Sequence, residues 1–180
     1  MKNVIRSVSL GAAVVLAAST LLTTSIMAQP GKKGGGMRTY TEPAITAGQA
    51  LTIVKAALPG ITAGKTIVKT GKRGEQILDV TLVLNGTIVS RVKLNPATGE
   101  IMIKGQDVMV RELLASQAQA TKVVQEAIPK LEVASVRSGK EGQWIADLTL
   151  NKGVVASIGV HSGNGSILPD WKAFQDASLY

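Results

Sequence analysis

Few residues of this chain have the type and spacing that catalysis requires. His161 is the only histidine, and the sequence contains no cysteine. A metal site or a histidine-based catalytic pair needs partners at suitable spacing, and His161 has none. No serine is placed to form a nucleophilic triad with it. We expect His161 to be an exposed turn residue, and we predict a protein without catalytic residues, metal ligands or cofactors.

Two aspartates, Asp79 and Asp147, occupy matching places in two similar segments. A general acid–base pair must reach one substrate within hydrogen-bond range. We expect these two carboxylates on the outward faces of separate sheets, where they would face solvent. The glycine-rich segments 31–36 and 71–74 are too short, and in the wrong context, for a phosphate-binding loop. This chemistry therefore indicates no enzyme.

The segments that hold these aspartates are the most informative part of the sequence. Residues 74–82 (GEQILDVTL) and 142–150 (GQWIADLTL) share Gly, Ile, Asp, Thr and the last Leu at a constant offset of 68. Apolar and polar residues alternate in both, which is typical of a half-buried strand. A strand that occurs twice predicts a structural unit that occurs twice.

Each of these strands is preceded by a predicted helix. Thr46 with Gln49, and Ser116 with Gln119, have the spacing of a capping box. Each box is followed by apolar residues at helical spacing, and a proline then ends the helix. The two apolar stripes are Ala50, Ile53, Val54, Ala57 and Leu58, and Ala120, Val123, Val124, Ala127 and Ile128.

Each strand is followed by a predicted hairpin. A two-residue turn at Asn85-Gly86 would place Arg91 and Lys93 on the buried face. A turn that also includes Thr87 keeps both outside, and a slip of one residue inverts a strand's faces. We therefore predict three-residue turns, the second at 151–153. Arg91 and Lys93 then form a basic outer face, and we take them as candidate partner-binding residues.

The predicted fold class is α+β, with two tandem repeats of one helix packed on a three- to four-stranded antiparallel sheet. The predicted segments are a signal peptide (1–28), a flexible Gly/Lys linker (29–43), repeat 1 (44–104), a connector (105–115), repeat 2 (116–168) and a tail (169–180). We expect the tail to dock on repeat 2 through Trp171 and Phe174. Trp144 opens the second strand, and strand alternation favours a core position over an exposed binding anchor.

The first residues predict export. Lys2 and Arg6 precede an apolar run that ends near Ala28, as in a secretory signal peptide. The alternative is an uncleaved N-terminal anchor. No later segment is apolar enough to cross a membrane. We expect a periplasmic or extracellular protein with cleavage near Ala28.

The formal charge of +8 falls to +6 without Lys2 and Arg6. A basic balance is compatible with nucleic acid, anionic surfaces or acidic partners. The chain has one Phe, two Tyr and two Trp, too few for stacking single-stranded nucleic acid. We therefore expect no nucleic-acid partner.

These segments resemble a known family. A helix that ends Ala-Leu-Pro-Gly (57–60), an alternating strand, a hairpin and a closing Asn-Pro-Ala-Thr-Gly-Glu-Ile (95–101) are similar to the PepSY domain. The family commonly has Asp at the position of Asn95. The second copy departs further, with Lys130 in place of Gly and Asn-Gly-Ser (164–166) in place of Thr-Gly-Glu.

The PepSY resemblance implies a binding protein rather than an enzyme. Such domains occur in propeptides of thermolysin-type secreted proteases, and they are thought to inhibit or regulate extracytoplasmic peptidases. We therefore expect a protein that binds and modulates another secreted or envelope protein, with a peptidase as first candidate. The alternative is a structural or ligand-binding envelope protein whose basic surface holds an anionic polymer or lipid. The sequence leaves the oligomeric state open.

Overall fold

The computed structural model describes residues 42–180. The predicted signal peptide lies outside the described residues, as does nearly all of the predicted linker. Three helices and six strands make up the described part of the chain, which has the predicted α+β class. Each half has the order helix, short 3-10 turn and three strands. The first half has α1 (Ala47–Ala57), β1 (Ile61–Thr70), β2 (Gln76–Leu84) and β3 (Thr87–Leu94). The second half has α2 (Gln117–Ala127), β4 (Glu132–Ser138), β5 (Trp144–Leu150) and β6 (Gly153–Val160), and α3 (Trp171–Leu179) follows.

Both long helices begin at the residues that the capping pattern predicts. Thr46 accepts a hydrogen bond from the backbone N–H of Gln49 at 3.2 Å, and the Gln49 side chain accepts one from the Thr46 N–H at 2.7 Å. In α2, Ser116 accepts from the Gln119 N–H at 3.1 Å. These bonds satisfy N–H groups that the first turn of a helix leaves free.

Each half contributes one three-stranded antiparallel sheet, in the orders β1-β2-β3 and β4-β5-β6. Single bridges, Leu94 to Ile101 and Val160 to Ile167, stand where the predicted closing strands were expected. The sheets adjoin along β3 and β6, and the Ser90 hydroxyl donates to the Ser157 carbonyl across this line at 2.8 Å.

The predicted three-residue hairpin turns are wrong. Leu84 pairs with Thr87, which leaves the two-residue turn Asn85-Gly86. Both turn residues have positive φ, 48° and 79°, as a type I′ turn requires. A bulge at Val89 then shifts β3 by one residue, so the deeper core pairs still form as expected. The second hairpin likewise turns at residues 151–152, with a bulge between the pairs of Leu148 and Thr149.

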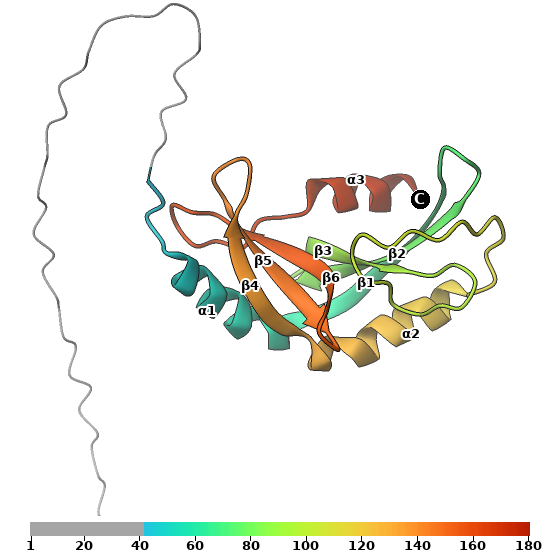
Figure 1. Cartoon of the computed structure of the whole chain (residues 1–180), viewed down its shortest axis with the longest axis horizontal. Coiled ribbons are helices and arrows are strands. Elements are labelled where there is room, and N and C mark those ends of the chain that lie inside the picture. Colours follow the sequence, from blue (N-terminus) through green and yellow to red (C-terminus); the bar gives the residue numbers. More distant parts are fainter. Residues whose placement is uncertain (1–41) are drawn as a thin grey trace, which may run out of the picture. The chain divides into compact units, whose positions relative to one another are not determined.

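The helix that covers each sheet comes from the other half of the chain. In Figure 1, α1 lies beneath β4, β5 and β6, while α2 lies beneath β1, β2 and β3. Gln125 of α2 accepts from the Ala63 N–H of β1 at 2.9 Å. The Trp144 indole of β5 donates to the Ile45 carbonyl, just before α1, at 2.9 Å. Sequence analysis predicted that each helix would cover its own sheet, and this pairing is wrong.

The exchanged helices make one continuous core. Val54 of α1 and Val124 of α2 are both buried, as their apolar stripes predict. They belong to a single cluster that includes Leu78 and Val80 of the first sheet and Leu148 of the second. Neither sheet therefore has a separate hydrophobic interior.

The short helix α3 lies on the opposite side of the sheets from α1 and α2 (Figure 1). It packs against β1 and β3 of the first sheet, and the Asp170 N–H donates to the Ile88 carbonyl at 2.9 Å. The prediction that the tail docks on the second repeat through its aromatic residues is wrong. Trp171 and Phe174 are 70% and 52% exposed, and Ala173 is the buried residue of the helix.

Candidate functional site

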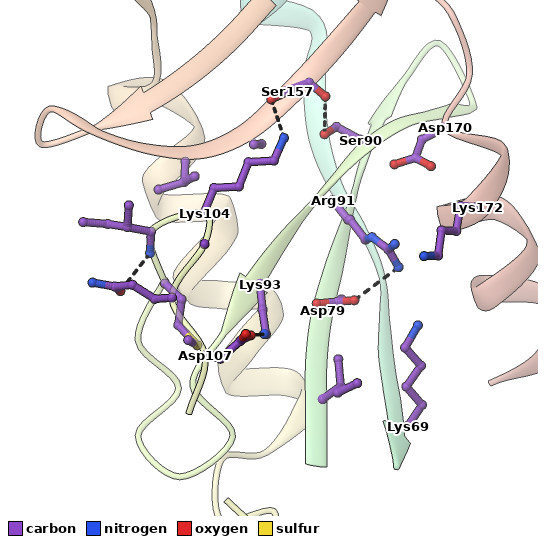
Figure 2. Close-up of a pocket in the computed structure, with 17 residues that line it drawn as sticks. Lys69, Asp79, Ser90, Arg91, Lys93, Lys104, Asp107, Ser157, Asp170 and Lys172 are labelled. Atoms are coloured by element: carbon purple, nitrogen blue, oxygen red, sulfur yellow. Dashed lines mark hydrogen bonds and ion pairs between the residues drawn. The ribbon is translucent and has the colours of Figure 1, made fainter. Parts of the chain in front are cut away.

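A cleft of about 490 Å³ that is lined by many charged side chains lies where the two sheets and α3 meet. Its walls are the outer face of the first sheet, the start of the connector, the edge of β6 and the first turn of α3. Figure 2 shows the charged side chains that line it. Its basic residues are Lys69, Arg91, Lys93, Lys104 and Lys172, and its acidic residues are Asp79, Asp107 and Asp170.

Asp79 is the most buried ionisable group of the cleft. It is only 5% exposed, and its partner Arg91 lies 3.3 Å away from Nη1 to Oδ2 (Figure 2). Burial raises the pKa of Asp79 above its ordinary value, because it removes water from the charged form, and the positive charge of Arg91 opposes this effect only in part. Sequence analysis placed Asp79 in solvent. That prediction is wrong, because α3 covers this face of the sheet.

A second carboxylate comes from α3. The Asp176 Oδ2 atom lies 2.6 Å from Arg91 Nη1 and 2.5 Å from Lys69 Nζ. The hydrogen bond from Lys69, followed by that from Arg91, lowers the pKa of Asp176. Arg91 is thus shared between the buried carboxylate of β2 and the carboxylate of α3.

A separate polar network fixes the boundary between the sheets. Ser157 of β6 donates to Asp147 of β5 at 2.6 Å and accepts from Lys104, the residue just before the connector, at 2.7 Å. Arg137 of β4 contacts the same Asp147 at 3.3 Å. The two aspartates that sequence analysis compared therefore belong to different networks.

Both candidate partner-binding residues line the cleft, but their surroundings differ from the prediction. The Arg91 side chain is 22% exposed and is held by two carboxylates. Lys93 is more accessible and pairs with Asp107 at 2.7 Å. Lys93 thus keeps an accessible charge, whereas Arg91 is an internal structural partner.

The structure places His161 and Trp144 much as the sequence predicted. His161 is exposed, and its Nδ1 accepts the backbone N–H of Gly163 at 3.0 Å, within the turn that follows β6. Trp144 is partly buried against the core.

Within residues 42–180, no group of three or more His, Cys, Asp or Glu side chains could hold a metal ion. No helix in this part of the chain has the length and apolar character needed to cross a membrane.

Sequence analysis missed the aromatic surface beside the cleft. The Trp171 and Phe174 rings meet edge to face, with 6.1 Å between their centroids. They project from α3, whose first turn is capped by the Asp170 carboxylate through the Ala173 N–H at 2.9 Å. The sequence did contain a signal for α3. Asp170 stands three residues before Ala173, and an aspartate at this spacing commonly caps the start of a helix.

No protein-family model matches this chain, and no curated protein or solved structure matches it. The site must therefore be interpreted from its own geometry. It combines a charged cleft with an exposed aromatic pair on α3.

Proposed function

We propose that this chain is an exported, non-enzymatic protein of two tandem PepSY-like repeats that binds and modulates another secreted or envelope protein. A peptidase is the first candidate partner. The proposal starts from the PepSY-like motifs at 57–60 and 95–101. The matching order of helix, 3-10 turn and three strands in the two halves supports the idea of a repeat.

The observation that carries the proposal is the exposed aromatic pair on α3, the helix from which Lys172 and the capping residue Asp170 line the cleft. Trp171 is 70% exposed and contacts Phe174, so the two rings form one apolar surface. Tryptophan is enriched among the residues that dominate binding energy at protein interfaces, and contiguous exposed apolar surface marks such interfaces. The charged cleft next to it supplies the polar rim that interfaces usually have.

The test is affinity capture from an envelope extract of the native host, with the tag placed before residue 42 so that α3 stays free. The Trp171→Ala/Phe174→Ala variant should lose the partner. Leu114→Ala is the matched control, because Leu114 is 69% exposed and lies on the connector. A captured peptidase should change its activity when the purified protein is added in equal amount.

The outcomes separate the two functions that the sequence leaves open. A protein complex that resists salt and is lost only in the aromatic variant supports the proposal. Binding to anionic vesicles that disappears with salt, without a protein partner, favours an anionic polymer or lipid instead, because exposed charges are screened within about 8 Å at physiological ionic strength.

A further inference from the structure

Helix α3 is attached to the rest of the protein mainly by polar contacts. Its Asp176 pairs with Lys69 and Arg91, and the Ala177 carbonyl accepts from Lys65 at 2.7 Å. Ala173 is the buried apolar residue of this helix, while the large side chains face solvent. An isolated helix of this length is only marginally stable in water. The attachment of α3 therefore depends strongly on one carboxylate.

The surface beneath α3 is built to receive a carboxylate. Ile67, Thr81 and Asp79 are buried there. Lys69 and Arg91 stand above them with their cationic groups directed at Asp176. A guanidinium and an ammonium on one oxygen form charge-assisted hydrogen bonds, which are stronger than neutral ones. Without α3, these two cations would face solvent beside a single buried aspartate.

This arrangement is specific to the first sheet. Arg91 lies opposite Thr81 in the first hairpin, and Ser157 lies opposite Asp147 at the same distance from the second turn. The second sheet thus has no arginine at this position, and α3 lies over the first sheet.

We propose that α3 acts as an internal ligand and that the surface beneath it, on β1 and β3, binds a carboxylate from an acidic segment of the partner protein once α3 is released. The inference rests on the proposed binding function and adds the chemistry of the partner. Charge complementarity indicates that the ligand of this surface is a carboxylate, because Lys69 and Arg91 already hold the Asp176 carboxylate while α3 is in place.

The experiment compares the full chain with its Asp176→Asn variant, using a short oligoglutamate peptide as the probe. The variant should bind the probe about tenfold more tightly or better, because the apparent affinity of a covered site falls with the fraction of protein in which it is open. Glu132→Gln is the matched control, since it makes the same change of charge at an exposed position on β4. Adding Lys69→Gln to Asp176→Asn should remove the gain.

Two further measurements keep the test decisive if Asp176→Asn weakens the fold. A synthetic peptide of residues 168–180 should displace oligoglutamate from the variant, and the same peptide carrying Asp176→Asn should not. The chain contains no cysteine, so a spin label at Ser178→Cys reports α3 alone, and it should become more mobile when Asp176 is changed.

Equal binding of the probe by wild type and Asp176→Asn, or a gain that survives Lys69→Gln, would overturn the inference. Failure to capture any host protein while the peptide results hold would reject only the proposed function.

Discussion

Replacing Arg91 by Met tests whether the buried charge of Asp79 is balanced by this one side chain. Removing one partner of a buried ion pair typically costs about 3–5 kcal/mol, because the remaining charge loses its compensation. Asp79 can avoid part of this cost by taking up a proton. Protonating a carboxyl group of ordinary pKa, about 3.9, costs about 1.36 kcal/mol for each pH unit above that value. Arg91→Met should therefore lower the free energy of unfolding by at most about 4 kcal/mol near neutral pH.

The same reasoning predicts a pH dependence. The pKa of Asp79 is already raised in the folded protein, so its contribution to folding becomes more favourable as the pH falls toward that raised pKa. The largest loss of unfolding free energy that Arg91→Met can cause therefore falls to about 1.5 kcal/mol near pH 5. Asp176 acts in the opposite direction, because its pKa is lowered, and the stability it provides is lost as the pH falls below its ordinary pKa. Arg91→Met also removes one of the two cations that hold Asp176. The change at Asp79 is therefore isolated by comparing Arg91→Met with the double variant Asp79→Asn/Arg91→Met at each pH, since Asp176 has the same partners in both.

Urea unfolding at several pH values, followed by circular dichroism, measures these differences. Asp79→Asn is the control, because it removes the buried charge while Arg91 keeps Asp176. We expect it to change the free energy of unfolding by less than about 1 kcal/mol, and the double variant to be more stable than Arg91→Met alone. A loss in Arg91→Met that is the same near pH 5 and pH 7, or an equal loss in Asp79→Asn, would refute the reasoning.

Three further predictions follow from the packing and from the sequence. Val54→Asp and Val124→Asp should each lower the free energy of unfolding by several kcal/mol. Amide hydrogen exchange should rise first in β4–β6 for Val54→Asp and first in β1–β3 for Val124→Asp. The reverse pattern would contradict the exchange of helices between the sheets. Gly64→Ala should destabilise the protein by about 1–3 kcal/mol in thermal melts, since its Cβ would lie 2.5 Å from Thr81 Oγ1, and an unchanged melting temperature would show that β1 can move away. The protein isolated from its native host should begin near Gln29, as N-terminal sequencing can establish, and an intact start at Met1 in the cytosol would disprove export.

Local patterns were sufficient to predict α1, α2, the six strands and the fold class, but the segment of α3 was predicted only as a tail and the two closing strands are single bridges. The capping residues and apolar stripes place α1 and α2 within about one residue, since both signals act over a few neighbouring positions. The core pattern also fixed the deep pairs of β2 and β3, such as Val80 with Val92. The turn length was predicted wrongly because the β-bulge at Val89 adds one residue to β3. A two-residue turn can therefore lead to the same deep strand pairs as a three-residue turn.

The helix exchange and the cleft could not be predicted in this way. A stripe such as Ala50 and Val54 shows that a helix face is buried, but not which of two similar sheets covers it. Alternation likewise assigns Asp79 to the face opposite the core, and it cannot indicate that a third helix covers that face. The location of α3 depends on contacts between residues far apart in the chain, such as Lys69 with Asp176.

The exchange of helices also bears on the order in which the chain can fold during synthesis. Domains generally fold as units while the chain emerges, with the N-terminal unit first. Here α1 needs β4, β5 and β6 before its apolar face is covered, and the first sheet needs α2. The first half therefore stays incomplete until nearly the whole second half has been made. Contacts between distant segments slow folding, so a newly made chain remains open for longer than two independent units of the same size would.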